Sequence, residues 1–427
     1  MPSWLAAALE YLASWLEFQR RLHDHPGCVV AVAYRGRIVL DEASGYADLG
    51  KGTPLTPRHR FRVASHSKSF TAAGIIKLRA QGKLRLDDRI GRYVCGLHPA
   101  AARATLEELL SHSAGVVRDG RDSGQFSDRR AFLGREEVVA DLKAPPPLRR
   151  GTRFKYSNHG YALLGMAIES VTGERYRDWI AREIVAAAGL EETTPDMPLP
   201  RGTPFARGHT GRLPAGRPLV IPGDFDTRAI CPAGGFVSTA ADLARFFWQL
   251  RGERAMLRPR WRDPHSSIER YYGLGIMSGA LRGWRWYGHS GGLQGYITRT
   301  VVLPRHELAI SVLTNSIVGL AHPWVHGAMD IFRTMKTRSG RHWRGRWWTV
   351  WGAVDVVPVR GRLLLATPAF FNPFLDAPEI RGRRVALAGG FANHGERVRL
   401  GRNELWLGGT RYLREAAAAR EIMARYR

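Results

Sequence analysis

The spacing of apolar residues along the chain predicts its first elements. Between positions 4 and 16, apolar side chains recur three or four residues apart, which predicts an amphipathic helix packed against the rest of its domain. After this segment, the spacing of apolar residues changes from three or four residues to two. Two β-rich runs, 28–34 and 37–40, flank an Arg-Gly pair, so a β-hairpin is predicted there.

Helical and strand patterns alternate through the middle of the chain. Helices are predicted over 69–82, 105–110, 161–171, 176–188 and 240–250. Thr105 and Glu108 have the spacing of a capping box, which predicts the start of the second of these helices. Strands are predicted over 273–277, 284–287, 296–303 and 308–313. Residues 116–150 and 195–222 are expected to be loops.

The pattern changes again near residue 338. Short β runs separated by Gly-containing turns follow, at 347–359, 363–366, 385–387, 397–400 and 405–407. They predict a small all-β domain of sandwich or barrel type, closed by a short Ala/Arg helix. The predicted domains are therefore 1–337 and 338–427, and chemistry-bearing residues cluster in the first.

Composition is that of a globular protein. The chain has 427 residues, 44% hydrophobic and 24% charged, and no run reaches the roughly 18 apolar residues of a membrane helix. Three widely spaced cysteines give no disulfide framework. The N-terminal segment also lacks the basic start of a secretory signal. These features predict a cytoplasmic protein without a membrane span.

The net charge of +26 raises the question of a nucleic-acid partner. Only seven of the 64 basic residues are lysines, and the arginines are spread along the whole chain. The densest basic cluster, 338–348, interleaves arginine with tryptophan, which is compatible with contact to an anionic surface. A solvated linker explains the cluster more simply. We expect weak polyanion binding at low salt and no specific nucleic-acid partner.

Ser65 and Lys68 are the first candidates for catalysis. They lie three residues apart at the start of a helix that is apolar nearly all round, so their side chains share one face. A buried lysine needs a partner or a function. A hydroxyl beside an amine that can accept its proton is a nucleophilic pair, although an N-cap serine beside a surface lysine would give the same pattern.

Two further stretches carry candidate residues. Tyr156 and Asn158 precede a helix, where tyrosine can serve as a second base and asparagine can both donate to and accept from a bound amide or ester. His289 begins the sequence His-Ser-Gly-Gly at the rim of a predicted strand. Its glycines allow close approach of a ligand to the backbone.

The three stretches together resemble the serine β-lactamase and penicillin-recognising family, in the branch near class C enzymes, esterases and D-aminopeptidases. That family carries S-x-x-K, Y-x-N and K-T-G or H-x-G motifs in this order. The flanks are also similar, at 61–73, 109–115 and 234–244. The resemblance covers about residues 25–335. It implies an α/β (α+β) fold with an antiparallel sheet flanked by helices and a helical subdomain.

The resemblance also implies roles for single residues. Ser65 would be the acylated nucleophile, Lys68 its activating partner, and Tyr156 would share base and leaving-group proton transfer. Asn158 would orient the scissile group, and His289 would take the place of the third-motif lysine. Ser290, Gly291 and Gly292 would complete the substrate-binding strand, with the backbone N–H groups of Ser65 and Gly292 as the oxyanion hole.

The histidine at position 289 affects the expected substrate. Lysine there is typical of β-lactamases, whose substrates carry a carboxylate, whereas histidine is more usual in esterase-like and D-aminopeptidase-like members. We therefore expect a serine hydrolase acting through an acyl-enzyme on a small ester or amide, without metal or cofactor. A D-aminopeptidase or DD-carboxypeptidase is the alternative, and a β-lactamase or a catalytically silent binding module ranks lower. The sequence does not indicate an oligomeric state.

Two rival sites have weaker support in the sequence. Residues 288–292 match G-x-S-x-G, which would make Ser290 the nucleophile of an α/β-hydrolase. That motif requires a following helix, and the residues after it have strand composition. His23 and His25 suggest a metal site, but no third ligand recurs at a suitable spacing.

Overall fold

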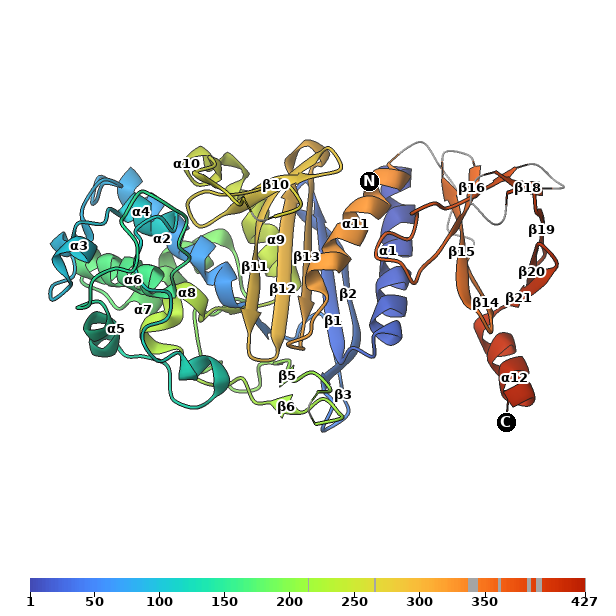
Figure 1. Ribbon diagram of the computed structural model, residues 1–427, viewed down its shortest axis with the longest axis horizontal. Helices are drawn as coiled ribbons and strands as arrows, with labels where there is room; N and C mark the ends of the chain where they lie inside the picture. The colour runs from blue at the N-terminus through green and yellow to red at the C-terminus, as the bar shows by residue number, and fades with distance from the viewer. Residues whose placement is uncertain are drawn as a thin grey trace. The chain divides into compact units, whose positions relative to one another are not determined.

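The computed structural model describes residues 1–213, 215–264, 266–336, 345–359, 362–381, 385–388 and 394–426. Within these ranges the chain forms two compact units (Figure 1). One unit is residues 25–322, and the other joins residues 1–24 to residues 323–427. The boundary predicted at 337/338 remains a prediction. Most of the basic cluster 338–348 lies outside the described residues.

The larger unit is built on an antiparallel sheet. Its nine described strands have the order β3-β2-β1-β13-β12-β11-β10-β9-β8. Their bounds in chain order are β1 Gly27–Tyr34, β2 Arg37–Asp48, β3 Thr53–Pro54, β8 Trp261–Arg262, β9 Arg270–Tyr272, β10 Met277–Leu281, β11 Trp284–Leu293, β12 Tyr296–Leu303 and β13 Leu308–Thr314. Strand β1 is an apolar run buried along seven of its eight residues, as expected for a strand covered on both faces. It pairs with β13, which joins the N-terminal hairpin to the later strands.

Helices cover the sheet and form a subdomain beside it (Figure 1). Helix α9, Ala240–Gln249, packs on β1, β12 and β13. Helix α2, Ser67–Ala80, packs with α6, Asn158–Thr172, and α8, Cys231–Gly234. The remaining α-helices are α3 Pro99–Ala102, α4 Leu106–Leu110, α5 Arg135–Asp141, α7 Tyr176–Ile180 and α10 Arg254–Leu257. Two short pairs complete the unit, β4 Phe61–Arg62 with β7 Val237–Ser238 and β5 Gly208–His209 with β6 Val220–Ile221.

A buried arginine supports the segment that leads to Ser65. The Arg62 guanidinium is fully buried and donates to Asp196 Oδ1 at 2.9 Å and to the carbonyls of Gly223, Phe225 and Gly235. Asp196 also accepts from Arg177 at 3.0 Å. Because its donors are satisfied by these acceptors, Arg62 anchors β4 to the loop 195–235.

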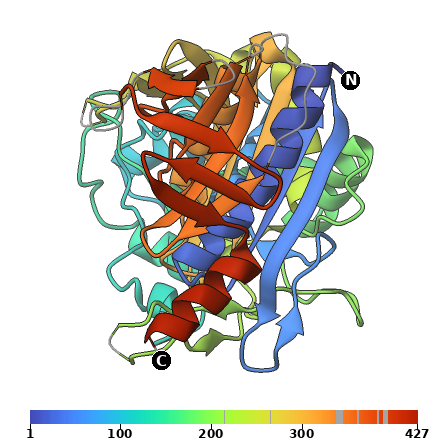
Figure 2. The same cartoon turned by 90° about the vertical axis from the view of Figure 1, so that its right-hand side faces the viewer.

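The smaller unit contains the first helix and the C-terminal strands. Helix α1, Ser3–Leu22, packs on α11, Ala321–Met335, where Trp15 fills the space next to Gly327. The eight described C-terminal strands close into a barrel, β14 Arg346–Thr349, β15 Gly352–Val359, β16 Arg362–Ala366, β17 Glu379–Arg381, β18 Val385–Ala388, β19 Arg397–Leu400, β20 Glu404–Leu407 and β21 Thr410–Leu413. Helix α12, Glu415–Tyr426, follows β21 (Figure 2). A small all-β C-terminal sheet with a closing helix was predicted, and the sheet is confirmed.

Candidate active site

Ser65 lies in a short 3-10 turn, Ala64–His66, between β4 and α2. Hydrogen bonds hold the turn to the segment before α9. Val63 N–H donates to Phe236 O at 3.0 Å. The Ser67 hydroxyl donates to Ala64 O at 2.6 Å and accepts from Phe236 N–H at 3.0 Å. Ala64 has a φ of +48°, a left-handed conformation that is strained for a residue with a side chain and is common near functional sites.

The Lys68 amine is fully buried among three oxygen atoms. Its Nζ lies 2.8 Å from Asn158 Oδ1, 2.6 Å from Ala233 O and 3.2 Å from Ser65 Oγ. The rings of Tyr156 and Tyr161 also face it, with centroids at 4.7 and 5.5 Å. Burial lowers the pKa of Lys68 well below its usual value, because the low-dielectric site disfavours the ammonium form.

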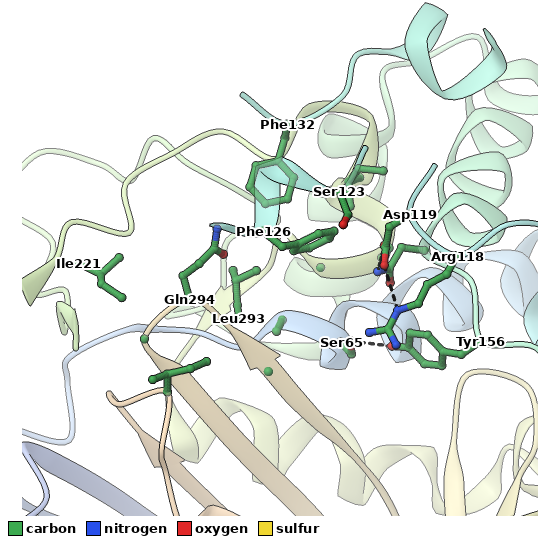
Figure 3. A pocket seen from close by; sticks show the side chains of 18 of the residues that line it. Ser65, Arg118, Asp119, Ser123, Phe126, Phe132, Tyr156, Ile221, Leu293 and Gln294 are labelled. Atoms are coloured by element: carbon green, nitrogen blue, oxygen red, sulfur yellow. Dashed lines mark hydrogen bonds and ion pairs between the residues drawn. The ribbon is translucent and has the colours of Figure 1, made fainter. Parts of the chain in front are cut away.

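Tyr156 contacts the same serine oxygen as Lys68. Its hydroxyl donates to Ser65 Oγ at 2.7 Å (Figure 3). Burial raises the pKa of Tyr156 well above its usual value, so the side chain is a neutral phenol at pH 7. The loop 111–115 supports this tyrosine. His112 Nδ1 accepts from Ser157 N–H at 3.2 Å, and its ring packs on Tyr156 with centroids 4.2 Å apart.

The third stretch lies on β11 next to the serine turn. The His289 ring is buried, its Nδ1 lies 2.7 Å from Ser290 O and its Nε2 lies 3.0 Å from the Tyr272 hydroxyl. Burial lowers the pKa of His289 well below its usual value. Gly291 contacts the backbone at Val63, whereas Ser290 Oγ lies 3.7 Å from Met277 Sδ.

A pocket of about 480 Å³ opens in front of Ser65 (Figure 3). Tyr156, Asn158 and Gly292 lie at the serine end of its wall. The opposite part of the wall is largely apolar. Its apolar side chains come from the loops 116–150 and 195–222, from the turn before α8, from the end of β11 and from the segment after β13, namely Phe126, Phe132, Ile221, Ile230, Leu293 and Ile317. His289, Ser290 and Gly291 are not among the described residues that line the pocket. Its volume is typical of small-molecule sites.

A comparison with known protein families identifies the family of this chain. The profile of the family described as "Beta-lactamase" matches residues 16–321. The chain belongs to the beta-lactamase family. The resemblance inferred from the motifs and the predicted fold class are therefore confirmed, and the family is one of serine hydrolases.

Three proteins that are similar to this chain share about a quarter of its sequence or less. "Protein flp" of Staphylococcus aureus (strain NCTC 8325 / PS 47) is 23% identical over 302 residues, covering 68% of this chain and 59% of that protein. The chain thus spans about three fifths of the length of this relative. The solved structure of an octameric penicillin-binding protein homologue from Pyrococcus abyssi is similar with a TM-score of 0.68 and 23% identity, over 95% of this chain and 99% of that one. D-amino acid amidase from Ochrobactrum anthropi SV3, complexed with D-phenylalanine, has a TM-score of 0.67 and 25% identity, over 76% and 99% of the two chains.

The two rival sites of this beta-lactamase-family chain find no support in the structure. Strand β11 is followed by β12 rather than by a helix, so Ser290 is not on the strand-to-helix turn of an α/β-hydrolase. Within the described ranges, no group of three or more His, Cys, Asp and Glu side chains could hold a metal ion.

None of the described helices is both long and apolar enough to cross a membrane.

Several contacts at the site were not predicted from the sequence. Arg118 and Asp119 line the pocket beside Tyr156 and Asn158, Ala233 supplies a carbonyl to Lys68, and Tyr272 contacts His289. Ala233 borders the flank 234–244, whose similarity to the family is the one sequence signal near it. Arg118 and Asp119 lie in a segment that the sequence predicts only as loop.

Gly291 fixes the distance between β11 and the serine turn. We expect Gly291→Ala to lower the free energy of unfolding by about 1–3 kcal/mol, as overpacking does in well-packed cores. A methyl group there would overlap Val63 O and lie 2.5 Å from Thr298 Oγ1. Gly252→Ala is the matched control, because a methyl group at Gly252 meets no atom within 4 Å. Denaturant unfolding of both variants measures the difference, and equal stabilities would contradict this close approach.

Buried histidines around the site predict acid sensitivity. Burial lowers the pKa of His66 to about 3 and lowers the pKa values of His112 and His289. In the unfolded chain these histidines bind protons below about pH 6.5, while in the folded protein they stay neutral. The free energy of unfolding should therefore fall as pH drops from 6.5 towards 4, by up to about 1.4 kcal/mol per pH unit for each histidine. Urea titrations at several pH values test this, and stability that stays flat from pH 7 to 4.5 would contradict it.

Proposed function

We propose that the chain is a serine hydrolase that forms an acyl-enzyme at Ser65 and acts on a small ester or amide. One observation carries this proposal. Ser65 Oγ lies between the Tyr156 hydroxyl at 2.7 Å and the buried Lys68 amine at 3.2 Å, and it faces a pocket large enough for a small molecule.

The two pKa shifts favour different roles for Lys68 and Tyr156. With the amine neutral, its two N–H groups satisfy Asn158 Oδ1 and Ala233 O, and its lone pair can accept the Ser65 proton. Tyr156 is a phenol and a donor. Lys68 is therefore the proposed base, and Tyr156 the donor that carries a proton to the leaving group.

The acylation step forms one bond to the substrate carbonyl carbon and breaks another. Ser65 Oγ bonds to this carbon while its proton passes to Lys68 Nζ, and the resulting oxyanion accepts from the backbone N–H groups of Ser65 and Gly292. The bond to the leaving group breaks as Tyr156 protonates that group, and the proton on Lys68 restores the phenol. Water hydrolyses the acyl-enzyme by the reverse proton path.

The charge of the site supports an ester or amide rather than a β-lactam. His289 stands in the place of a lysine, and its lowered pKa leaves it uncharged. Among the described wall residues Arg118 is the one cationic side chain, and it is ion-paired with Asp119 at 2.9 Å. No free cation of the described wall is thus available for a substrate carboxylate, while the apolar side of the pocket fits a hydrophobic acyl or amine group. The similarity to D-amino acid amidase keeps a D-aminopeptidase as the second candidate.

The proposed compartment is the cytoplasm. All three cysteines are free, and Cys28 and Cys231 are buried, which supports a reducing environment.

A trapped acyl-enzyme tests the proposed function. The protein is incubated with p-nitrophenyl esters, D-amino-acid amides and nitrocefin, quenched in acid, and digested for mass spectrometry. We expect turnover of esters or amides above nitrocefin and an added acyl mass on the peptide that contains Ser65. Nitrocefin as the best substrate, or an acyl group on another residue, would contradict the proposal.

A further inference from the structure

Arg118 and Asp119 form a charged pair at the mouth of the pocket, outside the three motifs. Asp119 Oδ2 accepts from Arg118 Nε at 2.9 Å, and the Arg118 guanidinium lies over the Tyr156 ring, 5.3 Å from its centroid (Figure 3). The backbone of the pair is also tied to the site, because Arg118 O accepts from Asn158 N–H at 2.9 Å and from His159 N–H at 3.2 Å.

The second oxygen of Asp119 determines which way the Asn158 amide points. Asp119 Oδ1 accepts from Asn158 Nδ2 at 2.5 Å, while Asn158 Oδ1 lies 2.8 Å from Lys68 Nζ. A carboxylate only accepts, so the amide NH₂ must face Asp119 and the amide oxygen must face Lys68. If the amide were reversed, its oxygen would face the Asp119 carboxylate, which is unfavourable, and its NH₂ would compete with the Ser65 hydroxyl for the lone pair of the amine.

We propose that Asp119 and Arg118 are positioning residues for the Lys68 amine. This inference rests on the proposed function for its catalytic meaning. Asp119 holds the Asn158 amide in the one orientation that binds a Lys68 N–H, which leaves the remaining direction of the amine for Ser65. Arg118 holds Asp119 from the other side.

The pair also sets the charge that the amine experiences. Burial is the main cause of the low pKa of Lys68, the charge of Asp119 acts against it by raising this pKa, and Arg118 acts with it by lowering this pKa. The other titratable groups that face Lys68 are two tyrosines and two histidines, namely Tyr156, Tyr161, His112 and His289. These histidines are neutral near pH 7 because burial lowers their pKa values, and burial raises the pKa values of the tyrosines. The pair thus supplies the fixed charges nearest to Lys68 among these groups.

Removing the charge of Asp119 and removing the charge of Arg118 should shift the pKa of Lys68 in opposite directions. Asp119→Asn keeps an oxygen for the Asn158 NH₂ but removes a negative charge, so the pKa of Lys68 should fall. Arg118→Gln removes a positive charge, so this pKa should rise. We expect shifts of roughly one pH unit. They are read from the ¹³Cε resonance of Lys68 in lysine-labelled protein, which has seven lysines, and the assignment comes from Lys68→Arg.

A third variant separates the effect of Asp119 on the orientation of the Asn158 amide from its effect on the pKa of Lys68. Asp119→Ala removes the acceptor as well as the charge, so the rate of acylation by a fluorophosphonate at its optimum pH should fall about 10- to 100-fold. Asp119→Asn should lose less rate and move the acid limb of the pH profile to lower pH, while Arg118→Gln moves it to higher pH. Asp87→Asn is the control, because it removes an exposed carboxylate paired with Arg85.

The outcomes separate the two proposals. Opposite pKa shifts with a matching displacement of the acid limb support the positioning pair. Unchanged Lys68 resonances in Asp119→Asn and Arg118→Gln overturn it, as does a rate in Asp119→Ala equal to that of the folded wild type. A wild-type protein that is never acylated at Ser65 would remove the proposed function, and the resonance shifts would still decide whether the pair controls the amine.

Discussion

Lys68→Arg should abolish acylation, with an expected loss of about 10²- to 10⁴-fold in the rate at pH 7. The reason is that the residue at position 68 must accept the proton of Ser65. Burial lowers the pKa of the lysine amine, which makes its neutral form accessible, whereas a guanidinium remains protonated and cannot accept the Ser65 proton. The rate of labelling by a fluorophosphonate, with the melting temperature measured in parallel, checks this expectation.

Lys68→Met separates loss of the base from misfolding. Methionine has a similar length and carries no proton acceptor, so it should be as inactive as the arginine variant. Its unfolding free energy near pH 7 should stay within about 3 kcal/mol of the wild-type value, because removal of the buried charge offsets the lost hydrogen bonds to Asn158 Oδ1 and Ala233 O. A lysine whose pKa is lowered by folding makes the folded state less stable at every pH below its unfolded pKa of about 10.4. Methionine carries no charge, so it removes this penalty. Near-normal labelling of either variant would refute the role of Lys68.

Tyr156→Phe should slow acylation about 10²-fold or more. The phenylalanine variant keeps the ring over Lys68 but removes the hydroxyl that donates to Ser65 Oγ at 2.7 Å. Substrates with poor leaving groups need that proton most, because they leave as strong bases. The loss should therefore be larger for alkyl esters or amides than for p-nitrophenyl esters, and steady-state kinetics on matched pairs of substrates measures the difference.

Tyr161→Phe is the matched control for the tyrosine variant. Tyr161 also faces Lys68, but its hydroxyl donates to Leu110 O at 2.7 Å and not to Ser65. Its removal should cost about 1–3 kcal/mol of stability and leave the leaving-group dependence unchanged. The same leaving-group dependence in both variants would argue against proton donation by Tyr156.

Local signals made much of the fold predictable. The Thr105–Glu108 capping box occurs as expected at the start of α4, and the periods of two and of three to four located most helices and strands. Residues 176–188 were predicted as one helix, but the structure has α7, a π-helical segment at Ala181–Val185 and a 3-10 turn before Gly189. These helix types differ in which carbonyl each backbone N–H bonds, and hydrophobic spacing over so few residues does not reveal that difference.

Side-chain directions were less predictable than positions. The sequence placed His289 in the third motif, but its ring is buried against Tyr272 instead of lining the pocket. Asp119 was missed because its importance depends on Asn158, 39 residues later in the chain. Neither residue carries a local pattern that predicts such a contact. The two segments that were expected to be loops, 116–150 and 195–222, line the pocket through residues such as Phe126 and Ile221.

The most direct test of Ser65 as the nucleophile is labelling by a fluorophosphonate probe followed by peptide mass spectrometry. We expect one labelled residue, Ser65, with labelling lost in Ser65→Ala and retained in Ser290→Ala. Labelling that persists in Ser65→Ala and disappears in Ser290→Ala would contradict this role of Ser65.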